Sequence, residues 1–286
     1  MYTPAKSKKK KITLAAADAP PGLDAVRNAA GGSLCSLLDP GLAAVLPKLA
    51  PDALRGIRTC DDDRGALIDS IGVARLAPDR LSGSHALYDV PFLGDEACSA
   101  LMEDMRAHVA RGGSPDYDCA EMGLAATMHD LATGAVVPLA AAVGLLAASD
   151  DAAGSGSDDG SATASDQWRT HGFCIWHEAG EDAPYSLWTY PHDNGDGTSE
   201  LTNEHTDSSL VTLNFCLGAS EDLGGSEVVF YGAPTPPGLP RNPNRPSHRH
   251  AAVAGRGVLH AGENSHDVLP IRTGWRANLI LWISPR

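Results

Sequence analysis

Two histidines and one aspartate in the C-terminal half of the chain have the residue types of a metal site. His205 and Asp207 are separated by one residue, and His266 lies much later in the chain. Two imidazoles and one carboxylate form the ligand set that binds ferrous iron and leaves coordination positions open for oxygen and a co-substrate. We therefore take these three residues as candidate catalytic ligands of one iron(II) ion.

His205 and Asp207 lie just before a segment that alternates like a β-strand. Between residues 210 and 217, apolar side chains occupy every second position, which is typical of a half-buried strand. In an extended chain, side chains two residues apart point to the same face, with Cα atoms roughly 7 Å apart. This spacing lets the pair bind one metal ion. His-x-Asp alone arises by chance in a chain with 11 His and 36 acidic residues, so the assignment depends on the sequence around His266.

The residues after His266 give a geometric expectation for a further contact. We interpret residues 272–274 as a three-residue hairpin loop, so that His266 faces Ile280. His266 and Arg276 then project from one face of the ladder, roughly 13 Å apart. A dicarboxylic keto acid that chelates iron beside His266 would span that gap, and a guanidinium binds a carboxylate through two parallel hydrogen bonds. The pattern predicts that Arg276 holds the far end of a co-substrate.

Several motifs occur in a fixed order along this half of the chain. They are His205-Thr206-Asp207, the strand Leu223-Gly224-Gly225-Ser226-Glu227-Val228-Val229-Phe230, the segment His266-Asp267-Val268-Leu269-Pro270-Ile271, and Arg276. Together they resemble the core of iron(II)- and 2-oxoglutarate-dependent dioxygenases, in particular the prolyl 4-hydroxylase-like branch. The resemblance covers roughly residues 170–284, and residues 88–98 resemble the strand and helix that open such domains. Many members of the branch have Lys at the position of Arg276, so the likeness is to the branch rather than to collagen-modifying enzymes.

The resemblance implies a fold and an activity. The fold is α+β, with a double-stranded β-helix core of the jelly-roll or cupin type and supporting helices outside it. The activity is hydroxylation of a substrate by O2, coupled to oxidative decarboxylation of 2-oxoglutarate to succinate and CO2, with ascorbate as reductant. In this scheme His205, Asp207 and His266 hold Fe(II). Arg276 binds 2-oxoglutarate, helped by Thr212 and by the hydroxyl of Tyr190.

The substrate and some alternatives stay open. Peptidyl proline is suggested by analogy with the branch, and another side chain or a small molecule fits the residues as well. One rival is a non-catalytic jelly-roll binding module with a vestigial metal site. Another is a cupin-like oxygenase that uses iron without a keto acid, for which Arg276 is dispensable.

Other residues compete for a metal. His248, His250 and His260 are alternative iron ligands, but only His266 is followed by the proline and the Gly-x-Arg sequence of the family motif. The acidic stretch 193–196 has oxygen ligands suited to calcium. It lacks the downstream bidentate Glu of a standard calcium loop.

The composition of the chain limits which classes of molecule it can bind. The 286 residues, 43% hydrophobic, are enough for a substantial core. The net charge is −14, although residues 6–11 hold a lysine cluster, so the body of the chain is strongly acidic and repels nucleic acid and anionic membranes. This leaves proteins, peptides or small molecules as substrates. The lysine cluster is either a targeting signal or a solvated tail, and the oligomeric state is not predicted.

Cysteine usage and hydropathy indicate a compartment. The six cysteines form no Cys-x-x-Cys pair and no regular spacing, which favours reduced thiols in a cytoplasmic or nuclear protein. No signal peptide is visible behind the lysine cluster. Pro138 interrupts the longest apolar run, residues 132–148, so we expect no membrane span.

The chain divides by composition into segments. We expect a disordered basic tail (1–32), a helical N-terminal extension (33–85) and the dioxygenase domain (86–286), the last with helices over 95–147, a low-complexity loop over 149–166 and the jelly-roll core over 168–284. The most regular helix is predicted over residues 96–111, because apolar residues recur there at intervals of four and Gly112 ends the pattern. A second helical region, 120–146, is expected to bend or split at Pro138.

Overall fold

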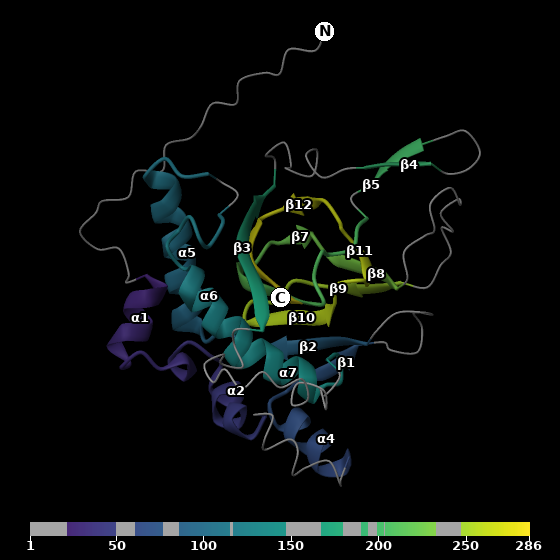
Figure 1. Cartoon of the computed structure of the whole chain (residues 1–286). Helices are drawn as coiled ribbons and strands as arrows, with labels where there is room; N and C mark the ends of the chain where they lie inside the picture. Colours follow the sequence, from purple (N-terminus) through teal and green to yellow (C-terminus); the bar gives the residue numbers. More distant parts are fainter. Residues whose placement is uncertain are drawn as a thin grey trace.

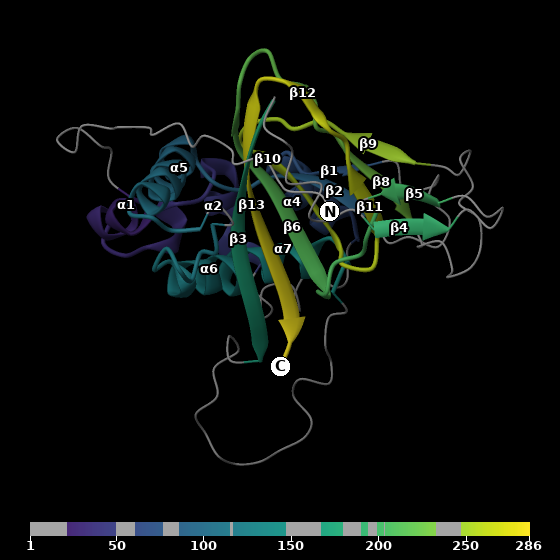
Figure 2. The same ribbon diagram turned by 90° about the horizontal axis from the view of Figure 1, so that it is seen from above.

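Strands gather on one side of the molecule and helices on the other (Figure 1). The computed structural model describes residues 22–49, 61–76, 86–114, 117–146, 167–179, 190–193, 199–202, 204–232 and 247–286. Antiparallel sheets form the core of this part of the chain, and the helices pack against the outer face of the larger sheet (Figures 1 and 2).

The larger sheet has six strands in the order β1-β2-β10-β6-β13-β3. Their bounds are β1 Ala74–Leu76, β2 Leu87–Pro91, β3 Trp168–Glu178, β6 Val211–Ala219, β10 Arg256–Ala261 and β13 Trp275–Pro285. Strand β2 confirms the strand expected near residue 88. Strand β1 comes from the N-terminal extension, so the extension is not wholly helical.

Strand β13 shows how the larger sheet separates two environments. Its odd-numbered side chains from 277 to 283 are buried and belong to the same apolar core as the helices. Its even-numbered side chains point the other way because side chains alternate along a strand. Arg276 and Asn278 on this inner face line a cavity together with Val228 and His250 of the smaller sheet. The inner face therefore looks into the space between the two sheets.

The smaller sheet has the order β11-β8-β9, with β8 Val228–Gly232, β9 His248–His250 and β11 Ser265–Val268. Successive strands alternate between the sheets: β6 lies in the larger, β8 and β9 in the smaller, β10 in the larger, β11 in the smaller and β13 in the larger. This alternation is the arrangement of a double-stranded β-helix, so the predicted fold class is confirmed. Two short pairs complete the strands: β7 Gly224–Gly225 with β12 Ile271–Thr273, and β4 Tyr190–Asp193 with β5 Ser199–Thr202.

The helices cover the apolar face of the larger sheet. The most regular one is observed as α5, Asp95–Ala110, which buries Leu101 and Met105. The second helical region is split as predicted, because a π-helical turn, η3 Ala132–Val136, separates α6 Ala125–Leu131 from α7 Val137–Ala142. Helix α1, Leu23–Ala29, lies within the segment 1–32 that is predicted to be disordered; that prediction is wrong for these residues, because Leu23 and Val26 are buried in the core. The N-terminal extension adds η1 Leu34–Ser36, α2 Pro40–Val45, η2 Leu46–Leu49 and α4 Asp61–Ser70.

The hairpin predicted after His266 is wrong. Strand β12 pairs with β7, whereas β13 enters the larger sheet between β6 and β3. Ile280 consequently lies opposite Asn214 and Phe173, not opposite His266. The physical reason is that β13 buries both of its faces, one against the helices and one in the barrel, which a two-stranded ribbon could not provide. His266 and Arg276 therefore come from facing sheets.

Some predictions fall outside the described residues. They are the basic tail up to residue 21, the low-complexity loop and most of the acidic stretch considered for calcium. In the described segments, no helix combines the length and the apolar character needed to span a bilayer.

The packing of Phe215 gives a prediction about stability. Its fully buried ring meets Phe92 edge-on, with ring centroids 5.8 Å apart. Phe215→Ala should lower the free energy of unfolding by about 3–5 kcal/mol, because it leaves a cavity beside the helices. Denaturant unfolding measures this. Val253→Ala is the control, since Val253 is 50% exposed and should change stability little; equal effects would contradict the packing described.

Candidate metal centre

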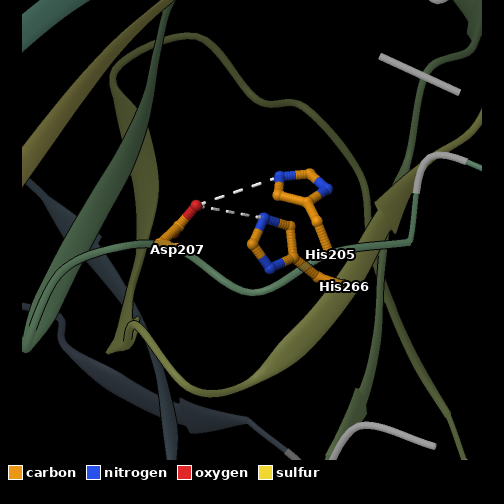
Figure 3. Close-up of side chains that lie close together, drawn as sticks. All are labelled: His205, Asp207 and His266. Carbon is orange, nitrogen blue, oxygen red and sulfur yellow. Dashed lines mark ion pairs between the residues drawn. The ribbon is translucent and has the colours of Figure 1, made fainter. Parts of the chain in front are cut away.

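The two histidines of the predicted triad are joined through their backbones. The N–H of His205 donates to the carbonyl of His266 at 2.8 Å, and the N–H of His266 donates back to the carbonyl of His205 at 2.9 Å. This mutual pair is the hydrogen-bonded type of antiparallel bridge, in which opposite side chains project to the same face. The two imidazole rings therefore lie together, with centroids 4.3 Å apart (Figure 3).

Asp207 reaches the same point from the turn that precedes β6. Its N–H donates to the carbonyl of Gly262 at 2.8 Å, which ties this turn to the end of β10. Its Oδ1 lies 3.9 Å from Nε2 of His205 and 3.9 Å from Nε2 of His266 (Figure 3). One ligand atom from each of the three residues lies within 4.8 Å of the others. The three predicted ligands thus converge: His266 comes from β11, and His205 and Asp207 come from the segment that precedes β6.

Gly262 explains why the turn that carries Asp207 can lie so close to the end of β10. A Cβ atom on this residue would lie 2.0 Å from the carbonyl oxygen of Ser209, a distance that no side chain tolerates. The Gly262 N–H also donates to the carbonyl of Leu210 at 3.1 Å. Absence of a side chain at residue 262 is therefore a condition for the position of Asp207.

The protonation state of His266 suits metal binding. Burial lowers the pKa of His266 to about 4, although the carboxylate of Asp207 opposes the shift. The imidazole is therefore neutral near pH 7. Its Nδ1 lies 2.9 Å from the carbonyl oxygen of Asn264, which can only accept, so Nδ1 carries the proton and Nε2 presents a lone pair toward Asp207. Metal-bound histidines usually donate their second N–H to a carbonyl in this way.

The second oxygen of Asp207 is held by hydroxyl groups. Thr212 donates its hydroxyl to Oδ2 at 2.7 Å, and the Ser209 hydroxyl lies 2.7 Å from that of Thr212. Because the Thr212 proton is directed at Asp207, Ser209 must donate to Thr212. Thr212 was expected to contact the co-substrate. The structure shows it orienting the carboxylate, and a contact with co-substrate stays a prediction.

The three competing histidines occupy different places. His248 and His250 lie on β9, and burial lowers the pKa of both. His260, on β10, has its Nε2 3.8 Å from Oδ2 of Asp207 and is 1% exposed. It lies beside the triad, although among the described residues only His205, Asp207 and His266 each bring one ligand atom within 4.8 Å of the others.

Arg276 lies on the inner face of β13, between the two sheets, and its contact with a co-substrate stays a prediction. It is 3% exposed and lines a cavity with Asn214, Cys216, Val228, His250, Ala252, Arg256, Val258 and Asn278. On the same face of β13, Trp282 lies opposite Thr212 at the metal end. The inner face of β13 thus runs from the metal centre to the guanidinium.

The surroundings of Arg276 include polar groups that the sequence reasoning missed. His177 lies opposite Arg276 on β3, and burial together with the guanidinium lowers the pKa of His177 to about 3. Asn278 donates its amide N–H to Asn214 at 2.6 Å inside the cavity. Tyr190 lies in β4, but its side chain is outside the described part of the chain, so its role stays a prediction.

The position of Thr212 predicts an effect on metal affinity. Thr212→Val keeps the shape of a buried strand residue and removes the hydroxyl that holds Asp207. We expect metal affinity to fall about 10- to 100-fold, the usual effect of losing a group that orients a ligand. Titration with cobalt(II) measures it. Thr170→Val is the matched control, because the Thr170 hydroxyl bonds to His129 on the helical side instead; equal affinities for the Thr212→Val chain and the unmodified chain would refute this role.

A short segment of the chain is similar to proteins whose names describe 2-oxoglutarate- and iron-dependent oxygenase domains. No family model matches the chain. A segment of 79 residues, 27% of this chain, is 34% identical to "2-oxoglutarate and iron-dependent oxygenase domain-containing protein ICU11" of Arabidopsis thaliana. A segment of the same length, 28% of this chain, is 35% identical to "2-oxoglutarate and iron-dependent oxygenase domain-containing protein 2" of Homo sapiens. The match spans about a fifth of these relatives, 19% and 21%.

Solved structures show similarity at lower identity. A prolyl-4-hydroxylase from Pseudomonas putida matches 78% of this chain and 95% of its own, at 14% identity and a TM-score of 0.40. The non-haem alpha-ketoglutarate-dependent epimerase SnoN from nogalamycin biosynthesis matches 77% of this chain and 84% of its own, at 15% identity and a TM-score of 0.45.

Proposed function

We propose that this chain, which resembles the iron(II)- and 2-oxoglutarate-dependent dioxygenases, is itself such an enzyme and hydroxylates its substrate while converting 2-oxoglutarate to succinate and CO2. The observation that carries the proposal is the convergence of His205, Asp207 and His266, each ligand atom within 4.8 Å of the others. Two imidazoles and a carboxylate fit ferrous iron, and they leave positions open on the ion.

Each residue of the triad has a definable task. His205 and His266 would bind iron through Nε2, and Asp207 would supply the negative charge that offsets part of the charge of the ion. Thr212 and the Asn264 carbonyl keep Asp207 and His266 in the required orientation. When bound, iron and 2-oxoglutarate supply the oxidative chemistry, and the protein supplies orientation and exclusion of water.

Arg276 is the proposed contact for the distal carboxylate of 2-oxoglutarate. A guanidinium stays charged at any physiological pH and grips a carboxylate through two hydrogen bonds. The neighbouring imidazole of His177 is neutral, because the pKa of His177 is lowered to about 3. It therefore adds no competing positive charge, and the attraction for the carboxylate is centred on Arg276.

Aromatic rings at the metal end of β13 and β3 favour a substrate that carries a ring. Trp282 and Phe173 meet edge-on with centroids 5.1 Å apart, and His171 lies 5.9 Å from Trp282. Phe173 and Trp282 are only partly buried, so ring surface stays accessible. Among the described residues, the buried indole N–H of Trp282 has no hydrogen-bond partner. A prolyl residue would offer a ring for this surface and a carbonyl for that N–H, which supports peptidyl proline as the finer proposal.

Iron retention and 2-oxoglutarate use should respond differently to two substitutions. Asp207→Ala should abolish iron retention, because one of three ligands is removed. Arg276→Ala should keep iron and mainly raise the KM for 2-oxoglutarate. Iron content and succinate formation, assayed with ferrous iron, 2-oxoglutarate and ascorbate, measure both effects. An Asp207→Ala chain that keeps iron and turnover would show that the ligand assignment is wrong.

The same assay separates the rival functions. A jelly-roll binding module with a vestigial site forms no succinate under any of these conditions. A cupin-like oxygenase that needs no keto acid also forms no succinate, but it consumes O2 without 2-oxoglutarate, and the Arg276→Ala chain consumes O2 equally.

The aromatic surface gives a prediction about substrate binding. Trp282→Ala should raise the KM for a proline-containing peptide several-fold, on the order of 1 kcal/mol of lost ring contact, and should leave succinate formation without peptide unchanged. Peptide-stimulated succinate formation is the measurement. Trp275→Ala is the matched control, because Trp275 projects from the opposite face of β13 and stacks on Trp176 at 4.7 Å. A panel of proline peptides that stimulates neither the unmodified chain nor the Trp275→Ala chain would contradict a prolyl substrate.

A further inference from the structure

We propose that the side-chain amide of Asn278 is a second contact, beside Arg276, for the distal carboxylate of 2-oxoglutarate, an inference that rests on the proposed function. The two residues lie two positions apart on the inner face of β13, with Cα atoms roughly 7 Å apart. Both line the cavity between the two sheets. Along β13, Asn278 lies between Arg276 and Trp282, on the side nearer to the candidate metal centre.

One end of the Asn278 amide is bonded and the other is not. Its Nδ2 donates to Oδ1 of Asn214 at 2.6 Å, and Asn214 lines the same cavity. Among the described residues, Oδ1 of Asn278 is buried and has no hydrogen-bond partner, and the residue is 4% exposed. A buried polar atom without a partner costs free energy, so a ligand that pairs with this end of the amide gains affinity.

Two other polar groups of the cavity are already paired. The guanidinium of Arg256 donates through Nε to the carboxylate of Asp89 at 2.8 Å. The Cys216 thiol donates to the carbonyl of Gly218 at 3.6 Å. Either group would have to give up a bond to bind a ligand, whereas Asn278 would not.

The pair of amides can present a donor to an anion. A carboxylate only accepts hydrogen bonds, as Oδ1 does, so an anionic ligand requires an N–H at this place. If both amides exchange the positions of oxygen and nitrogen, Asn214 donates to Asn278 and the hydrogen bond between them is kept. Nδ2 of Asn278 then replaces the unpaired oxygen. A guanidinium occupies one lone pair on each carboxylate oxygen, which leaves lone pairs for this further N–H.

A contact at this place distinguishes keto acids by their distal end. The distal end of 2-oxoglutarate is a carboxylate, whereas 2-oxopentanoate has the same number of carbon atoms and ends in a methyl group. Both would chelate the metal through the same keto acid end. Loss of the Asn278 amide should therefore weaken the binding of 2-oxoglutarate and not that of 2-oxopentanoate.

Calorimetric titration of the cobalt(II)-loaded chain with each keto acid tests this without turnover. In Asn278→Leu, the affinity for 2-oxoglutarate should fall about 10- to 100-fold, the usual effect of losing a hydrogen bond to a charged group. The affinity for 2-oxopentanoate should be unchanged. Asn278→Asp should weaken 2-oxoglutarate binding further, because it replaces the donor with a like charge. The control is Asn28→Leu, at an exposed position on α1, which should change neither affinity.

Two results would overturn the proposal: an unchanged affinity of Asn278→Leu for 2-oxoglutarate, or an equal loss for both keto acids, as a merely structural effect would give. Asn278→Asp decides the question in the same way if the leucine variant does not fold. Succinate formation by the unmodified chain is assayed separately. Succinate together with an unchanged Asn278→Leu affinity would refute the role of Asn278 alone. The selective loss without succinate would refute the proposed oxygenase activity alone, and an unmodified chain that does not bind 2-oxoglutarate would refute both.

Discussion

The mutual backbone hydrogen bonds between His205 and His266 are the constraint on which the metal centre depends. Each residue gives its N–H to the carbonyl of the other, at 2.8 and 2.9 Å. Side chains in a strand alternate, so a slip of one residue would turn an imidazole to the opposite face. The centre is therefore set by the register between two segments that are far apart in the chain.

That register is supported from outside the pair. The Ser265 hydroxyl donates to the Glu204 carboxylate at 2.5 Å, one residue before each histidine. The Asp207 N–H donates to Gly262, and the Gly262 N–H donates to Leu210, which locks the carboxylate to the end of β10. Since β10 and β6 pair in the larger sheet, the position of Asp207 follows from the pairing of the sheet itself. The ligands are placed by backbone bonds, and the side chains need little further adjustment.

Sequence patterns predict the parts of this arrangement that have a local signature. The alternation over residues 210–217 identifies β6, the four-residue spacing over 96–111 identifies α5, and the family motifs identify the triad, which the structure brings together. Strand partners have no such signature. The hairpin expected between β12 and β13 is a reasonable local pairing, but burial of both faces of β13 makes a different partner more favourable.

The polar residues of the barrel interior were missed for a related reason. Asn214 and Asn278 occupy the alternating positions that a one-sided strand would expose to solvent, so their residue types suggest an outer face. When two sheets face each other, those positions point into the space between them. Only the partner strands show this, and the same ambiguity made His260 one of several competing histidines.

The two faces of β13 have different roles, so one strand contributes both to the stability of the fold and to the candidate site. Its outer face is apolar and contributes to the core with the helices. Its inner face carries Arg276, Asn278 and Trp282, and burying such groups costs free energy unless they are paired. Among the described residues, Asn278 Oδ1 and Trp282 Nε1 have no partner, at a cost of about 1–3 kcal/mol for each group. These unpaired groups lower the stability of the fold on the face of β13 between the metal centre and Arg276. Binding of a polar ligand is the simplest reason why they are present there.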